Sequence, residues 1–174
     1  MRIILQTLIV VALFAFSHSS AYAGAVRESD IEKVKALLTK ANTLGSDINQ
    51  IGAAIAEGGT NAYIEGEKTL VCTQSLSHIT SAYSHILLAL SVSLENAKVM
   101  RDHFDEKIIL TEVRMWFSTI EEYIPGNRNT VNEISGNCQD SSLFNLKAQK
   151  LLDLMSEIDT ILPPIANRLG LQKY

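Results

Sequence analysis

One uninterrupted helical stripe occupies the middle of this chain and limits what the chain can fold into. Mostly apolar residues recur there in alternating steps of four and three: Cys72, Leu76, Ile79, Tyr83, Ile86, Leu90, Ser93, Ala97, Met100 and Phe104. Such spacing places all of them on one side of an α-helix. Residues 68–104 contain no Gly or Pro, and residues 86–94 are apolar on nearly all sides, as expected of a helix with several neighbours. We therefore predict a central helix over residues 68–104.

A second helix is predicted before it, over residues 30–56. Ser29 and Glu32 have the spacing of a capping box, and the stripe that follows keeps the same rhythm through Ile31, Val34, Leu38, Ala41, Gly45, Ile48, Gly52 and Ile55. Gly45 could divide this helix, because glycine is poor in a helix interior. The glycines at 58, 59 and 66 predict a connection to the central helix.

A third helix is predicted over residues 109–123. The stripe of the central helix becomes polar after Phe104, so the chain is expected to turn within residues 102–107. The apolar series restarts in another phase as Ile109, Val113, Trp116, Ile120 and Tyr123. Met115 is expected in the core with them, whereas Phe117 lies off the stripe, which favours the surface. Pro125-Gly126 predicts the end of the helix, and residues 127–140 then read as a long connection with at most one helical turn.

The last helix is predicted to begin at a cap formed by Asp140 to Ser142. Its stripe runs through Phe144, Ala148, Leu151, Met155, Ile158 and Leu162, and Pro163-Pro164 should kink or end it. Ile165, Leu169 and Leu171 then form an apolar C-terminal tail that favours contact with a partner. Four amphipathic helices without a strand pattern predict an all-α fold, an antiparallel up-down-up-down four-helix bundle.

The only two cysteines, Cys72 and Cys138, are predicted to form one disulfide. In an up-down-up-down bundle the starts of the second and fourth helices share one end, so the topology itself brings these cysteines together. A bond across this separation would stabilise the fold by about 4 kcal/mol on the chain-entropy model. A reactive thiol or a metal pair is the alternative, but neither cysteine has a Cys-x-x-Cys partner.

Residues 1–23 have the pattern of a secretory signal peptide. Arg2 precedes an apolar run from Ile3 to Phe16, and Ala21-Tyr22-Ala23 provides the small residues of a cleavage site. The run is too short for a membrane span of ~20 residues, and no later stretch qualifies. We expect one helical-bundle domain over residues 24–174 of an exported protein, periplasmic or secreted.

The histidines are the first candidates for a site. His78 and His85 are seven residues apart on one side of the central helix, which separates them by ~10 Å along its axis and rules out direct binding of one metal ion by both. They read as boundary residues on a serine-rich face. The alternative is a haem or metal site completed from another helix, so the candidate ligand-binding residues are His78, Tyr83, His85, Met115 and Trp116. His103, among acidic residues, reads as part of a solvated turn.

Two functions from different classes fit this sequence. The formal net charge is −4, and the basic residues are scattered, so nucleic acid is not an expected partner. No catalytic or phosphate-binding motif is present, so we expect no enzyme activity, cofactor or metal. The first hypothesis is an exported non-enzymatic protein-interaction or inhibitor-like module with a protein partner. The second is a carrier of a small apolar ligand, a lipid or haem, in a cavity of the bundle core.

Small residues on the core-facing stripes bear on that choice. They are Gly45, Gly52, Ser93, Ala97 and Ala148. Such residues either let two helices approach closely or leave an internal cavity, and only a cavity would make a ligand pocket.

Overall fold

The chain forms four long α-helices. The computed structural model describes residues 26–100, 106–138 and 142–171. Within them lie α2 (Glu28–Glu57), α3 (Gly59–Met100), α4 (Glu106–Asn137) and α5 (Ser142–Arg168), and this part of the chain contains no strand. The predicted all-α class is therefore confirmed. The predicted signal peptide, residues 1–23, falls outside the described residues.

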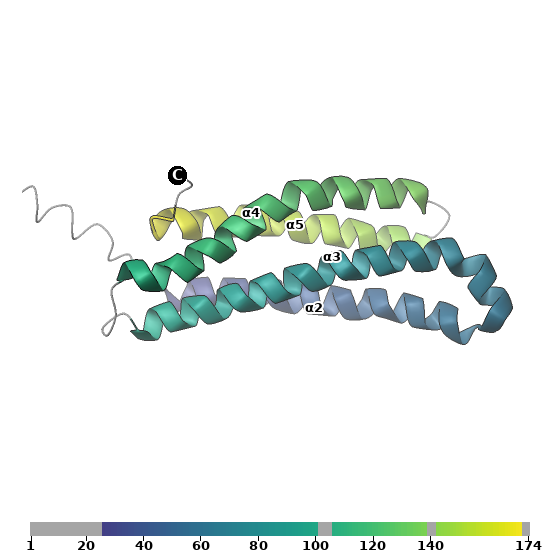
Figure 1. The fold of residues 1–174 in the computed structure, drawn as a ribbon, viewed down its shortest axis with the longest axis horizontal. Coiled ribbons are helices and arrows are strands. Elements are labelled where there is room, and N and C mark those ends of the chain that lie inside the picture. The colour runs from purple at the N-terminus through teal and green to yellow at the C-terminus, as the bar shows by residue number, and fades with distance from the viewer. Residues whose placement is uncertain (1–25, 101–105, 139–141, 172–174) are drawn as a thin grey trace, which may run out of the picture.

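The helices pack lengthwise around a common core. α2 packs against α3 and α5, and α4 packs against the same two helices. In Figure 1 the end of α2 and the start of α3 lie at one end of the molecule, together with the end of α4 and the start of α5. Consecutive helices in this view run in opposite directions, as an antiparallel bundle requires.

The predicted disulfide between Cys72 and Cys138 is present. Their Cα atoms are 6.7 Å apart, and the bond links residues 66 positions apart in the sequence. Cys72 lies in α3 and Cys138 directly follows α4, and both side chains are buried. The bond therefore fastens α3 to α4 at the end of the molecule where α4 ends.

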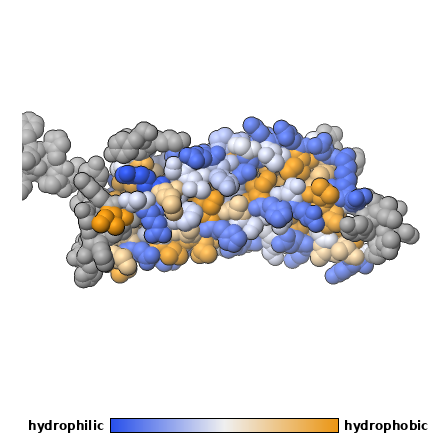
Figure 2. Space-filling view, in the orientation of Figure 1, coloured by the Kyte–Doolittle hydropathy of each residue, from blue (hydrophilic) through white to orange (hydrophobic). Residues whose placement is uncertain are grey.

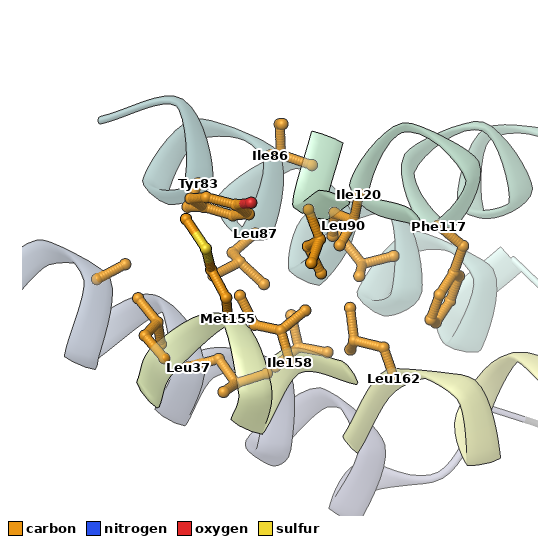
Figure 3. Close-up of a cluster of buried hydrophobic side chains, with 14 of the residues drawn as sticks. Leu37, Tyr83, Ile86, Leu87, Leu90, Phe117, Ile120, Met155, Ile158 and Leu162 are labelled. Carbon is orange, nitrogen blue, oxygen red and sulfur yellow. The ribbon is translucent and has the colours of Figure 1, made fainter. Parts of the chain in front are cut away.

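Large apolar side chains from all four helices fill the core. Tyr83, Leu87 and Leu90 of α3 are fully buried, as are Leu37 of α2 and Met155 of α5. Figure 3 shows these side chains directed into one cluster with Ile120 of α4. Such burial, at about 1.5–3 kcal/mol for each large apolar side chain, is the main favourable term for the fold.

Two core-facing glycines mark the close approach of α2 to α3. A Cβ placed on Gly45 would lie 3.5 Å from Cγ2 of Thr80, and one on Gly52 would lie 3.6 Å from Cδ1 of Leu70. These are ordinary van der Waals distances, so little space separates the backbone of α2 from α3 at either glycine. Close helix approach, rather than an internal cavity, accounts for both residues.

The predicted boundary of the third helix is wrong, because α4 continues through Pro125 and Gly126 to Asn137. Proline lacks the backbone N–H that would donate to the carbonyl of Glu121. Glu121 and Pro125 are both exposed, so water can replace the missing hydrogen bond. Figure 1 shows α4 changing direction near its middle. Ile124, Val131 and Cys138 are buried beyond the predicted end, and this burial holds the helix together. The predicted long connection over residues 127–140 is therefore helical up to Asn137.

The predicted phase of this helix is also wrong. Phe117 is buried, at 3% exposure, whereas Met115 and Tyr123 are about half exposed. The buried series is Leu110, Val113, Phe117, Ile120, Ile124 and Val131. Trp116 is partly buried at the edge of this series and packs against the core. The true stripe is thus displaced by one residue from the predicted one at several positions.

The start of the central helix also differs from the prediction. α3 begins at Gly59 rather than near Lys68, so the expected connection shrinks to Gly58. Gly66 lies inside the helix, where an added Cβ would stand 2.7 Å from Cγ2 of Ile55. A side chain there would clash with α2, so this glycine permits a close approach rather than a loop. Gly45 does not divide α2, which is continuous.

The N-terminus of α2 is capped differently from the prediction. The helix begins at Glu28, before the expected Ser29 box, and a carboxylate oxygen of Asp30 accepts the backbone N–H of Arg27 at 2.9 Å. The same oxygen pairs with the guanidinium of Arg168 from the end of α5. Asp30 is buried, and this ion pair ties the first turn of α2 to the last turn of α5.

The C-terminal segment is part of the core rather than an exposed tail. α5 passes through Pro163-Pro164 to Arg168, and Ile165, Leu169 and Leu171 are all buried. Gly170 adopts φ 68°, a left-handed conformation that favours glycine, and the N–H of Leu171 then reaches the carbonyl of Ala166 at 2.9 Å. The apolar tail therefore no longer supports the prediction of a partner.

Candidate functional site

The five predicted ligand-binding residues do not share one pocket. His78 and His85 are exposed and border two grooves between α2 and α3. Tyr83 is fully buried, and Met115 is half exposed on α4. Trp116 is partly buried, and its enclosed indole N–H has no hydrogen-bond partner in the described part of the chain. None of the four grooves described for this structure is lined by Tyr83, Met115 or Trp116.

Tyr83 has the surroundings of a packed core residue. The amide Nδ2 of Asn127 on α4 lies 3.4 Å from its phenolic oxygen and donates a long hydrogen bond to it. Burial raises the pKa of the Tyr83 hydroxyl, and the bond from Asn127 opposes this rise. Asn127 stands on the buried side of α4, seven residues after Ile120. This pair holds α3 to α4 and leaves the hydroxyl protonated at neutral pH.

A second stripe of α3, not predicted from the sequence, faces solvent. We call it the outer stripe; its members, again in steps of three and four, are Val71, Gln74, His78, Ser81, His85, Leu88, Val92, Glu95 and Val99. All are exposed except Glu95, which is half-buried. The four aliphatic members are strongly exposed, from 45% at Val92 to 74% at Val99. Figure 2 shows apolar surface over α3, interrupted by polar residues.

The outer stripe is almost free of charge. From Thr69 to Leu94, 26 consecutive residues include no Asp, Glu, Lys or Arg. Glu95 is the one charged member, and it forms an ion pair with Lys35 of α2. That pairing raises the pKa of the Lys35 amine above its usual value. By contrast, the exposed residues of the other helices include many charges, such as Glu32, Lys33, Glu112, Arg114, Glu122, Lys150 and Asp153.

A groove without charge lies between α2 and α3 beside the outer stripe. Its larger part measures about 340 Å³ and its smaller part about 230 Å³. The two parts share Asn49 and Ser77, whose side chains hydrogen-bond at 2.7 Å. We call both parts together the neutral groove; it is lined by Leu38, Asn42, Gly45, Asn49, Gly52, Leu70, Thr73, Gln74, Ser77, His78, Ser81, Ser84, His85 and Leu88. Its serines leave space that larger side chains would fill, and Gly45 and Gly52 border it where α2 approaches α3 closely.

A groove of opposite character lies on the other side of α2, against α5. It also measures about 340 Å³, and we call it the charged groove; it is lined by Thr39, Lys40, Thr43, Leu44, Asp47, Lys150, Asp153, Leu154 and Glu157. Lys40 pairs with Glu157. Asp47 pairs with Lys147, whose hydrogen bond holds the pKa of the Asp47 carboxyl below its usual value. The charges of this groove are largely satisfied within the chain.

A further groove, of about 450 Å³, lies beside the disulfide. It is lined by Glu67, Lys68, Val71, Cys72, Ser75, Ile134 and Asn137. Val71, the first member of the outer stripe, borders it.

The described residues include no group of three or more His, Cys, Asp or Glu side chains placed to hold a metal ion. None of the helices in the described part of the chain combines the length and apolarity that a membrane span needs.

The fold and site define a disulfide-linked all-α bundle with one uncharged, partly apolar outer helix face. A disulfide of this kind is compatible with an oxidising compartment. No protein-family model, curated protein or solved structure matches this chain.

Proposed function

We propose that this protein is an exported, non-enzymatic protein-interaction or inhibitor-like module, and that it docks a protein partner through the outer stripe of α3. The single observation behind this proposal is the exposure of Leu88, Val92 and Val99 on a helix face with no unpaired charge. Docking covers such a surface without removing water from charged groups, which is the costly part of burying a polar surface.

The periodicity supports a helical or flat protein surface as the partner. Exposed apolar residues scattered singly need no explanation, but these recur in steps of three and four along one side of a helix. This is the spacing by which one helix packs against another. The stripe spans 28 residue steps from Val71 to Val99, which corresponds to ~42 Å.

A small-ligand carrier has less support. Tyr83 and its neighbours are packed together, and the grooves bordered by His78 and His85 are open to solvent along the α2–α3 contact. A lipid or haem carrier needs a site that buries most of its ligand. Export itself is supported by the signal-like residues 1–23 and by the disulfide.

Site-specific photo-crosslinking in cells of the natural host tests the docking proposal. A photoreactive amino acid in place of Val92 is expected to give a discrete covalent adduct with a protein. The same amino acid in place of Glu122, an exposed residue of α4, should give none. The added substitution Leu88→Lys should abolish the Val92 adduct, because it places a charge within the surface. No adduct from Val92, or equal adducts from both positions, would refute the proposal.

A further inference from the structure

We infer that the partner is a second copy of this chain, and that the outer stripes of the two copies pack antiparallel about a two-fold axis near His85. This inference rests on the proposed docking role of the stripe and names its occupant. A symmetric pair of this kind uses the same surface patch on both copies, so the patch must be complementary to itself.

The charge distribution satisfies this requirement. In a two-fold pair every group meets a group of its own surface, so unpaired charges of one sign would repel one another. The exposed residues of α2, α4 and α5 include many charged side chains, and the chain as a whole has a net charge of −4. The outer stripe has only Glu95, which Lys35 neutralises. It is therefore the helix face on which two copies meet with the least repulsion.

The order of residues along the stripe favours the antiparallel direction. Val71 and Val99 are equally far from His85, fourteen residues on either side, so an antiparallel pair centred there sets Val71 of each copy against Val99 of the other. The same register sets Val92 against His78, seven residues on either side of His85. It also keeps the two Glu95–Lys35 pairs apart, whereas a parallel pair would place them together.

The neutral groove completes the fit. It lies beside the first half of the stripe, where Ser77, Ser81 and Ser84 leave space, while the larger aliphatic side chains Leu88, Val92 and Val99 lie in the second half. Antiparallel packing lays the second half of each copy over the groove half of the other. Each Leu88 and Val92 then meets the open side of the groove, as a side chain of one helix enters the space between those of its neighbour.

The available area is sufficient for a stable pair. The stripe is ~42 Å long and about one helix, or ~10 Å, wide, and the adjoining groove widens its first half to about two helices, or ~20 Å. It therefore offers roughly 600 Å² on each copy, so that two copies together exceed the total of about 1,000 Å² that a specific interface needs.

Single cysteine substitutions test both the pairing and its direction. His85→Cys should form a covalent dimer under mild oxidation, because the two His85 positions meet at the axis. Val99→Cys should form none, because its two positions would lie ~42 Å apart in the antiparallel pair. Glu122→Cys on α4 is the control for random collision. Each variant keeps the Cys72–Cys138 bond, which peptide mapping under non-reducing conditions checks.

Sedimentation of the wild-type protein measures the dissociation constant of the pair, which the cross-links do not give. Leu88→Lys should raise this constant at least about tenfold, because the symmetry places the new charge in the interface twice. Cross-linking of Val99→Cys as well as His85→Cys would indicate a parallel pair, in which each residue faces its own copy, and would overturn the proposed register.

Failure of this inference is distinguishable from failure of the docking proposal. A wild-type protein that stays monomeric, with a Val92 photo-adduct that contains another polypeptide, would refute the second copy and support docking. A monomer without any Val92 adduct would refute both. An adduct with twice the mass of one chain, together with the His85→Cys dimer, is the result expected here.

Discussion

The two grooves beside α2 are of similar size and differ in charge. Each has a part of about 340 Å³, but the charged groove is bordered by residues of the Lys40–Glu157 and Asp47–Lys147 ion pairs, whereas the lining of the neutral groove includes no Asp, Glu, Lys or Arg. A partner that filled the charged groove would have to desolvate or displace these ion pairs. A partner on the neutral groove would meet no Asp, Glu, Lys or Arg side chain, so charge rather than volume distinguishes the two as docking surfaces.

The same contrast exists within α3. One side of this helix, which includes Tyr83, Leu87 and Leu90, is buried against the other three helices. The outer stripe is exposed and still partly apolar. The chain uses the first for stability, and we propose that it uses the second for docking. Substitutions on the two sides of this helix should therefore have separable effects.

The largest expected effect is the loss of the disulfide that holds α3 to α4. Replacement of both Cys72 and Cys138 by Ser should lower the free energy of unfolding by about 4 kcal/mol, because the unfolded chain regains the freedom of a long loop. Urea unfolding of the oxidised wild type and the double variant measures this difference. Equal unfolding midpoints would show that the disulfide between α3 and α4 does not stabilise the folded protein.

A matched pair of leucines on α3 tests the contrast between its two sides. Leu90 is fully buried, and Leu88, two residues earlier, is 49% exposed. Leu90→Ala should cost about 2–5 kcal/mol of stability through lost burial and the cavity it leaves. Leu88→Ala should cost no more than about 0.5 kcal/mol, as expected of a surface position. These values apply to the monomer, so unfolding is followed at low protein concentration.

Comparable losses at the two leucines would contradict the account of α3. They would mean that Leu88 is buried in the folded monomer, and the outer stripe would then not be available to a partner.

The smallest expected effect concerns the pH dependence of the charged groove. The pKa of Asp47 is lowered in the folded state, so its pairing with Lys147 stabilises the protein above the unfolded-state pKa of an aspartate. That contribution is lost as the pH falls through the lowered folded-state value. Asp47→Asn should therefore reduce the loss of stability on acidification, as measured by urea unfolding between neutral and acidic pH.

The neutral groove supplies the control for that measurement. Asn49→Ala removes the acceptor of the Ser77 hydroxyl but no titratable group. Its stability should change by the same amount at every pH. A pH profile that Asp47→Asn leaves unaltered would show that the Asp47–Lys147 pair does not contribute to the acid sensitivity.

The number of helices and the disulfide could be predicted from the sequence because both depend on features that persist over long stretches. The stripe from Cys72 to Met100 has no breaker, and two cysteines allow one intramolecular pairing. The boundaries of α4 could not be predicted by the same rules. Pro125-Gly126 is a strong local stop signal, but burial of Ile124, Val131 and Cys138 outweighs the loss of one exposed hydrogen bond.

A signal for the full length of α4 was nevertheless present in the sequence. Val113, Phe117, Ile120, Ile124, Asn127, Val131, Ile134 and Cys138 follow one another in steps of four and three. Following this series through the proline would have given both the correct phase and the correct end. Starting from Ile109 and Trp116 instead placed Met115 and Tyr123 in the core and Phe117 at the surface.

The candidate site was recognised only in part. The sequence predicts His78 and His85 beside a serine-rich face, and in the structure both border the neutral groove with Ser77, Ser81 and Ser84. The outer stripe is not evident from the sequence, because apolar residues all around α3 are equally consistent with contacts within the bundle. The structure leaves Leu88, Val92 and Val99 exposed, and only the arrangement of the neighbouring helices could have revealed this.

Native mass spectrometry of the mature protein purified from its natural host tests the central claim most directly, because it detects a bound protein and a bound small molecule in one spectrum. The account predicts a species heavier than one chain by a whole polypeptide, and its loss in the Leu88→Lys variant. A single chain, alone or with a small molecule only, would contradict the claim that the outer stripe of α3 is a protein-docking surface.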